Sequence, residues 1–217
     1  MARVFSTHVF STHVYRRRPV PKIVDHDQRR VDLVQATWRI IARYGIDGAT
    51  MREIAAEAGF ANGALKPYFP TKDDLLAFAF GYVFDQTNRR VADSIRGHSG
   101  LDALRRYCME VLPVTDVTIS EARLVIPFWQ KALNDPDKAA LHADSMERWR
   151  VDFMRFLAEA REAGEVHTQA SDDVLAGQLM SFLLGAQITA SLTPDHHSPK
   201  QLIEHLDSWL RMVAADS

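Results

Sequence analysis

Apolar residues recur at intervals of three and four along most of the chain, from about residue 27 almost to the end. This spacing places side chains on one face of an α-helix. In the segment RRVDLVQATWRIIARYG, the apolar face comprises Val31, Val34, Trp38, Ile41 and Ala42, and Gly45 ends the helix. No segment alternates between apolar and polar residues for long enough to predict a strand. The pattern therefore predicts an all-α protein.

Capping residues divide this pattern into about nine helices. Thr50 and Glu53 form a capping-box pair for a helix over 50–58, and Thr71 begins a helix that runs to about residue 95. A short helix over 61–68 lies between them. Gly and Pro residues delimit five further helices, which we predict over 101–112, 117–134, 137–163, 172–192 and 199–213. We assign residues 25–72 to a small N-terminal domain and residues 73–217 to a larger C-terminal domain.

The two short helices at 50–58 and 61–68, joined by a Gly-Phe turn, describe a helix-turn-helix. In that motif the second helix enters the major groove of DNA. The inner positions are apolar, as packing requires: Ile54, Ala55, Phe60, Leu65 and Phe69. The outer positions can contact phosphates or base edges: Asn62, Ala64, Lys66 and Tyr68, with Gly63 permitting close approach. An ordinary helical corner would show the same capping pattern.

Residues 1–24 are predicted to form a flexible basic arm. A duplicated pentamer in VFSTHVFSTHVY precedes Arg16, Arg17, Arg18 and Lys22, which prolines separate. Such a segment can follow DNA phosphates or enter a minor groove. A solubilising tail would have the same composition.

The charge distribution agrees with a polyanion partner for the first third only. Residues 1–75 hold 12 Lys/Arg and 8 Asp/Glu, a net charge of +4, whereas residues 76–217 hold 14 and 20, a net charge of −6. The single cysteine, Cys108, excludes an intramolecular disulfide and fits a reducing compartment. Since no apolar run of about 18 residues and no signal-peptide pattern occur, we expect a cytoplasmic protein without a membrane partner.

No catalytic motif is present. The chain lacks G-x-S-x-G, GxxxxGK[ST] and HExxH, and its nine histidines are scattered. We therefore predict that the protein is not an enzyme and uses no cofactor or metal.

The segment TMREIAAEAGFANGALKPYFPTKDDLL, residues 50–76, resembles the signature of tetracycline-repressor-like (TetR) regulators. In that family a helix-turn-helix precedes an aromatic-Phe-Pro-x-Lys stretch. The resemblance implies that Thr50 caps its helix and meets a phosphate, that Tyr68 faces DNA and that Lys72 meets a phosphate. It also implies that Leu65 and Phe69 belong to the core.

Three positions depart from the family pattern: Ala61 replaces Ser or Thr, Lys66 replaces Tyr, and Pro67 stands inside the short helix. Pro67 has no N–H to donate to the carbonyl of Gly63, and its ring disfavours helical geometry at Lys66. We predict a strained, kinked or 3₁₀-like segment there, with Gly63 relieving the clash.

The resemblance further implies a homodimeric transcriptional regulator, by default a repressor, that binds a palindromic operator and is released by a small molecule. A helical dimeric ligand-binding or interaction protein without sequence-specific DNA binding is the alternative. Apolar stripes on the last two helices predict a dimeric four-helix bundle. We expect its interface to contain Leu179, Leu183, Ala186, Leu202, Leu206, Trp209, Leu210 and Val213.

Aromatic and polarizable residues between the domains predict a ligand cavity, helped by Pro127, which should distort its helix. Simple core packing is the alternative for any one of these residues. The predicted lining is Tyr82, Gln86, Tyr107, Met109, Phe128, Trp129, His142, Met146, Trp149, Phe153, Gln178 and Phe182, with Gln130 and Gln187 as further polar candidates. The pattern leaves the charge of the ligand open.

Overall fold

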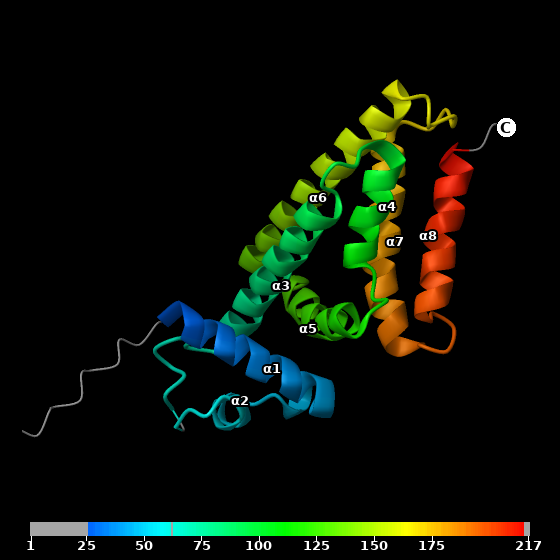
Figure 1. Cartoon of the computed structure of the whole chain (residues 1–217). Helices are drawn as coiled ribbons and strands as arrows, with labels where there is room; N and C mark the ends of the chain where they lie inside the picture. The colour runs from blue at the N-terminus through cyan, green and yellow to red at the C-terminus, as the bar shows by residue number, and fades with distance from the viewer. Residues whose placement is uncertain (1–25, 62, 215–217) are drawn as a thin grey trace, which may run out of the picture.

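The structure, a computed structural model, describes residues 26–61 and 63–214 (Figure 1). Within those ranges the chain is helical, with no strand. The elements are α1 (His26–Gly48), α2 (Met51–Glu57), α3 (Lys72–Ser94), α4 (Gly100–Val111), α5 (Asp116–Ala132), α6 (Pro136–Glu162), α7 (Asp172–Leu192) and α8 (Pro199–Ala214). The basic arm over 1–24 and Asn62 lie outside the described residues, so their roles remain predictions.

The prediction of an all-α fold is confirmed. The eight helices and the turns at 63–68 correspond to the nine predicted elements, and the helix ends agree with the expected positions within one or two residues. Gly45 ends the regular part of α1 with φ of 72°, as expected. The helix over 116–132 continues through Pro127 as one element. Local capping chemistry thus determines most of the boundaries.

Two apolar cores organise the molecule. The first core joins α1, α2, the 63–69 segment and the N-terminal half of α3, and it also takes Leu124, Val125 and Phe128 from α5. The second core packs α4, α6, α7, α8 and the C-terminal half of α3. Figure 1 shows α3 running from the small N-terminal part up alongside α6. The first core therefore extends past residue 72, where the sequence places the domain boundary.

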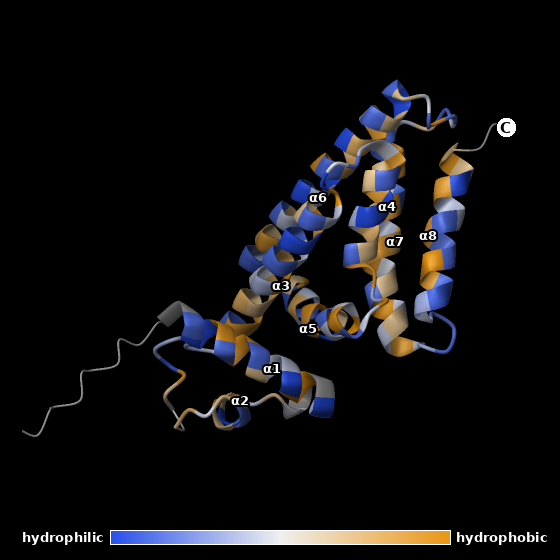
Figure 2. Ribbon diagram, in the orientation of Figure 1, coloured by the Kyte–Doolittle hydropathy of each residue, from blue (hydrophilic) through white to orange (hydrophobic). Residues whose placement is uncertain are grey.

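Helix α7 is coloured mainly as apolar on its visible side (Figure 2). By length and composition alone it could cross a membrane, which the sequence reading did not foresee because Gly, Ala, Ser and Thr interrupt its large residues. One face is buried in the second core, whereas Val174, Ile188 and Leu192 are exposed on the other. The helix therefore presents apolar surface outside the protomer as well as inside it.

The predicted dimer residues need correction. Seven of the eight are buried within a single protomer, in the second core: Leu179, Leu183, Ala186, Leu202, Leu206, Leu210 and Val213. Only Trp209 is half-buried, and its indole N–H donates to Oε1 of Gln178 at 3.4 Å. The strongest apolar stripe of each helix packs against its own chain. The sequence could not distinguish this arrangement from a dimer interface, because intrachain and interchain stripes have the same period. Any interface on these helices must use the opposite faces.

Candidate functional site

The N-terminus of α2 is fixed by a capping box. The Thr50 hydroxyl accepts from the N–H of Glu53 at 3.2 Å, and the Glu53 carboxylate accepts from the N–H of Thr50 at 3.1 Å. The same carboxylate accepts the Thr50 hydroxyl proton at 2.6 Å, and these bonds lower the pKa of Glu53. The predicted cap is confirmed. Because its hydroxyl proton is held by Glu53, Thr50 can donate to a phosphate only by turning away from that carboxylate.

A glycine turn ends α2 and sets the direction of the segment that follows. Gly59 has φ of 73°, and the N–H of Phe60 donates to the carbonyl of Ala55 at 2.8 Å while that of Gly59 donates to Ala56 at 3.1 Å. This is the Schellman arrangement, which requires a left-handed residue at the glycine position. The turn of the helix-turn-helix is therefore set by Gly59.

The reading segment at 63–68 is a run of turns rather than an α-helix. Three N–H groups donate three residues back: Ala64 to Ala61 at 3.0 Å, Lys66 to Gly63 at 3.4 Å and Tyr68 to Leu65 at 2.9 Å. Gly63 itself has φ of 85°, outside the helical region. Pro67 cannot bond the Gly63 carbonyl, so Lys66 takes that acceptor instead. The predicted helix over 61–68 is therefore replaced by turns at the described residues 63–68, and the predicted 3₁₀-like geometry beside Pro67 is confirmed. Relief of a clash at Gly63 stays a prediction.

The buried positions of this segment lie four residues apart, with exposed positions between them, as the motif requires. Leu65 and Phe69 are buried in the first core, whereas Gly63, Lys66 and Pro67 are exposed. Ala64 and Tyr68 are half-buried. Lys66 therefore presents the segment's positive charge to the surface.

Two arginines of α1 brace the reading segment, a feature that the sequence analysis missed. The Arg30 guanidinium donates to the carbonyl of Tyr68 at 3.5 Å and lies 5.1 Å from the ring of Phe78. Arg29 lies 5.0 Å from the ring of Phe60, which meets Tyr68 edge-on at 5.9 Å. The sequence shows arginines and aromatic residues that could stack on one another, but only the fold shows which ring each arginine meets.

The start of α3 repeats the capping box. The N–H of Asp74 donates to the Thr71 hydroxyl at 3.1 Å, and the Asp74 carboxylate accepts from the N–H and hydroxyl of Thr71 at 3.0 and 2.7 Å. Lys72 is the first residue of the helix and is half-buried, and its charge also helps to lower the pKa of Glu53. The charge of Lys72, at the start of α3, thus acts on the carboxylate that caps α2.

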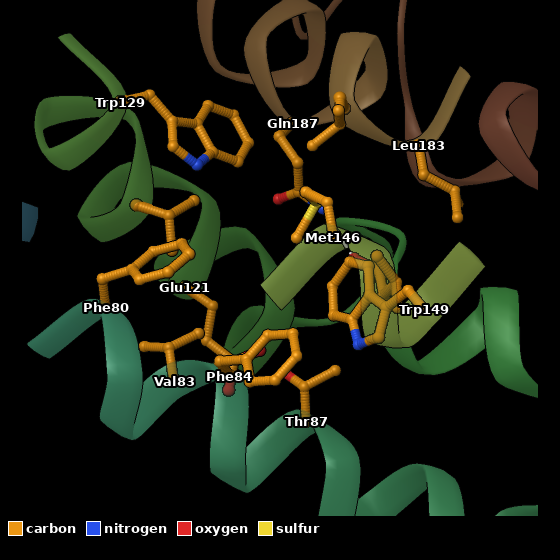
Figure 3. Close-up of a pocket in the computed structure, with 13 residues that line it drawn as sticks. Phe80, Val83, Phe84, Thr87, Glu121, Trp129, Met146, Trp149, Leu183 and Gln187 are labelled. Atoms are coloured by element: carbon orange, nitrogen blue, oxygen red, sulfur yellow. Dashed lines mark hydrogen bonds between the residues drawn. The ribbon is translucent and has the colours of Figure 1, made fainter. Parts of the chain in front are cut away.

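A cavity lies where the two cores meet, between α3, α5, α6 and α7 (Figure 3). Its walls leave about 470 Å³ unoccupied by protein atoms, a volume that includes space open to solvent. Its lining is mainly apolar and aromatic: Phe80, Val83, Phe84, Thr87, Val111, Glu121, Val125, Trp129, Met146, Trp149, Leu183, Leu184 and Gln187. Such a mixture of aromatic walls and a few polar groups is typical of small-molecule sites.

One buried ion pair forms part of the cavity wall. The carboxylate of Glu121, only 6% exposed, accepts two bonds from the guanidinium of Arg90 at 2.8 and 2.7 Å. Arg90 also donates to Glu110 at 3.3 Å and to the Thr87 hydroxyl at 3.2 Å. Burial raises the pKa of Glu121, although Arg90 opposes that shift. Two carboxylates share one guanidinium, so the network is net negative.

The aromatic residues of the wall differ in how their polar atoms are satisfied. The indole N–H of Trp149 donates to Oδ1 of Asn88 at 2.9 Å, and its ring stacks on Phe84 at 5.3 Å. The indole nitrogen of Trp129 and Nδ1 of His142 are buried and have no hydrogen-bond partner among the described residues. Burial lowers the pKa of His142. The cavity therefore has one satisfied and one unsatisfied indole.

The predicted pocket residues separate into two groups. Trp129, Met146 and Trp149 line the cavity, and so does Gln187, whose amide donates to the carbonyl of Val111 at 2.6 Å. The other predicted residues do not line it: Tyr82, Gln86, Tyr107, Met109, Phe128, His142, Phe153, Gln178, Phe182 and Gln130.

Physical reasons account for these corrections. Tyr107 and Phe153 pack edge-on at 5.0 Å inside the second core, and Phe128 stacks on Phe80 at 4.1 Å inside the first. Phe182 faces His205 of α8 at 6.5 Å, and Gln178 is exposed beside Trp209. Large aromatic residues fill cores as readily as they line cavities, so residue type alone did not separate these roles.

The sequence analysis missed the contribution of α3. Phe80, Val83, Phe84 and Thr87 follow the spacing of one helical face, and all four line the cavity. That spacing, together with a lone glutamate at 121 on an otherwise apolar helix face, was a detectable signal. The same helix begins at Lys72, and α5 contributes both to the first core and to the cavity wall. Helix α3 and the first core therefore connect the cavity with the reading segment.

The fold and these two sites define a helix-turn-helix DNA-binding protein with a cavity in its C-terminal part. The family model for the N-terminal part of bacterial regulatory proteins of the tetR family matches residues 33–78, and that for the BetI-type transcriptional repressor C-terminal domain matches residues 101–215. The chain belongs to the TetR family of transcriptional regulators and has a BetI-type C-terminal domain.

Known relatives agree with this assignment. The HTH-type transcriptional regulator PksA of Bacillus subtilis is 31% identical over 176 residues, which cover 81% of this chain and 84% of PksA. The crystal structure of a transcriptional regulator from Rhodococcus sp. Rha1 is 26% identical, with a TM-score of 0.74 and coverage of 85% and 95%. A regulator from Saccharomonospora viridis, solved in complex with choline, shares the fold with a TM-score of 0.80 at 21% identity, covering 88% and 100%.

We predict opposite stability effects for two glycine substitutions. Gly59→Ala should lower the free energy of unfolding by about 1 kcal/mol because a side chain is strained at positive φ. Nothing lies within 4 Å of the added methyl group, so the backbone alone causes the loss. Gly81→Ala, in the interior of α3 with equally open surroundings, should raise it by about 0.5–1 kcal/mol. Urea denaturation measures both, and equal signs would contradict this account.

Proposed function

We propose that this regulator binds a palindromic operator as a homodimer in the cytoplasm and leaves it when a small organic cation enters the cavity. The observation that carries the proposal is the path of α3. This helix begins at the DNA-side cap at Thr71 and supplies Phe80, Val83, Phe84 and Thr87 to the cavity wall. A ligand in the cavity therefore contacts the element that ends at the reading segment.

The proposed DNA surface combines the reading segment with the start of α3. Lys66 and Gly63 are exposed, and Ala64 and Tyr68 lie beside them. Lys72 and the N–H groups at the start of α3 suit a phosphate, because helix N-termini attract anions. Asn62 and Arg16, Arg17 and Arg18 complete the proposed contacts as sequence-based predictions. Thr50 would add a further phosphate contact once its hydroxyl turned away from the carboxylate of Glu53.

The proposed dimer interface is the outer face of α7 with the neighbouring face of α8. Ile188 is 41% exposed and Leu192 75% exposed on α7, while Met212 is 65% exposed on α8. Gly177, Ser181 and Gly185 are small residues of α7, which permit close helix approach. Two copies of this face can form a four-helix bundle around a two-fold axis.

The charge and the aromatic surfaces of the cavity support a cationic effector. Trp129 and Trp149 offer the ring type that attracts cations most strongly, and the Glu121–Arg90–Glu110 network adds net negative charge. Among the described residues that line the cavity, Glu121 is the only charged one. The fold relative with bound choline is consistent with a quaternary ammonium ligand.

Release follows from a shift between two conformations. The DNA-bound form must hold two reading segments about 34–36 Å apart, in successive major grooves. A ligand can favour release only if it binds better to a form with different spacing. Tilting of α3 and α5 around the shared first core would change that spacing, because both helices contact the cavity and the core.

Operator binding is tested by gel shift of the protein on its own upstream DNA over a salt series. We expect Lys66→Ala to weaken binding to every sequence and to reduce the slope of log K against log salt by about 0.9, the effect of one lost phosphate contact. Lys200→Ala removes an exposed charge on α8 and should leave the slope unchanged. An unchanged slope in the Lys66 variant would exclude that contact. No sequence-selective shift at low salt would favour the alternative, a ligand-binding protein that does not recognise DNA.

We expect Ile188→Arg to convert the dimer into a monomer, because two buried guanidinium groups would face each other across the two-fold axis. Folding should persist because Ile188 is exposed in the protomer. Sedimentation analysis gives the mass, and circular dichroism checks the fold. Leu133→Arg, at an 82% exposed apolar residue far from this face in sequence, is the matched control and should stay dimeric. A dimeric Ile188 variant would place the interface elsewhere.

Effector binding is tested with Glu121→Gln. The substitution keeps the shape of the wall but removes one carboxylate charge, so we expect at least about tenfold weaker binding of choline by calorimetry. Operator affinity without ligand should change little, which separates loss of binding from unfolding. Unaltered choline affinity in this variant would contradict an electrostatic role for the Glu121 network.

A further inference from the structure

The Trp129 end of the cavity contains an unused hydrogen-bond donor. The indole nitrogen of Trp129 is buried and donates to no described group. In Figure 3 this nitrogen lies on the edge of the ring that is turned toward Phe80 and Glu121. Leaving a buried donor unsatisfied costs free energy, which a ligand atom in the cavity would recover.

The chemistry of indole determines what kind of atom can satisfy it. Indole N–H donates and does not accept, so its partner must carry a free lone pair. No neighbouring side chain bonds it in the structure: Phe80 is apolar, His142 packs edge-on against Trp129 at 5.8 Å between ring centres, and the oxygens of Glu121 and Gln187, which also line the cavity, do not reach it. An oxygen of the occupant of the cavity can therefore take the place of the missing acceptor.

The charges around this end favour a neutral acceptor over a carboxylate. Arg90 is already bound by Glu121 and Glu110, and no described residue that lines the cavity is cationic. Burial lowers the pKa of His142, which favours the neutral form of this imidazole. A ligand carboxylate at Trp129 would be buried without a countercharge, which is costly.

We propose that Trp129 is a specificity-determining residue, whose indole N–H binds a neutral oxygen of the effector, such as a hydroxyl, ether or ester oxygen. This inference rests on the proposed cationic cavity and narrows its ligand class to cations that also carry such an oxygen. Trp149 has a different role, because its indole N–H is held by Asn88 and only its ring is available.

The test compares matched quaternary ammonium ions on the full-length protein by calorimetry. Choline and ethyltrimethylammonium differ only by the hydroxyl oxygen, and we expect choline to bind about five- to tenfold more tightly, the value of one hydrogen bond. In Trp129→Phe, which keeps an aromatic ring, that ratio should fall to about one. Trp149→Phe is the control: it should weaken both ions and keep the ratio.

Each other outcome has a distinct meaning. Equal binding of the two ions to the natural protein, or a ratio unchanged by Trp129→Phe, would overturn the role of Trp129 and leave the cationic cavity standing. Binding of neither ion would contradict the proposed cationic effector itself. Glycine betaine, which carries a carboxylate, should bind more weakly than choline, and tighter binding would overturn the neutral acceptor.

Discussion

The first core is the constraint on which the rest of the structure depends. It holds the reading segment through Leu65 and Phe69, and the same apolar cluster contains Phe80 of α3 and Phe128 of α5, stacked at 4.1 Å. Phe80 also lines the cavity. A packed interior responds to a local change by shifting whole elements, because it has few voids to absorb the displacement. The reading segment and the cavity therefore share one packed core, although the sequence separates them by domain.

The polar groups of the cavity wall show how a charge can be kept in an apolar interior. Glu121 is buried at the cost of desolvation, which the two bonds from Arg90 offset. Gln187 and Trp149 are satisfied by Val111 and Asn88. The indole nitrogen of Trp129, by contrast, is buried without a partner, as are the indole nitrogen of Trp38 and Nδ1 of His142 elsewhere among the described residues. Among the polar groups of the cavity wall, the Trp129 indole is therefore the one that our proposal assigns to the ligand.

Sequence reasoning succeeded where a feature depends on neighbours along the chain. The capping boxes at Thr50 and Thr71 and the 3₁₀-like geometry beside Pro67 involve residues within four positions of each other. It failed where two roles share one local pattern. Leu179 and Leu206 have the period of a dimer seam, yet they pack inside the protomer, and Tyr107 and Phe153 resemble cavity residues but fill the core.

The sequence by itself determined the all-α class, the helix ends, the helix-turn-helix and the break at Gly63 and Pro67, because hydrogen bonding and steric restriction of nearby backbone groups decide these features. The tertiary structure alone decided which face of α7 is buried, that α3 forms the cavity wall, and that Arg90 reaches Glu121, 31 positions away. Those features depend on which helices meet across the core. Helical periodicity gives each helix an apolar face but does not name the partner that covers it.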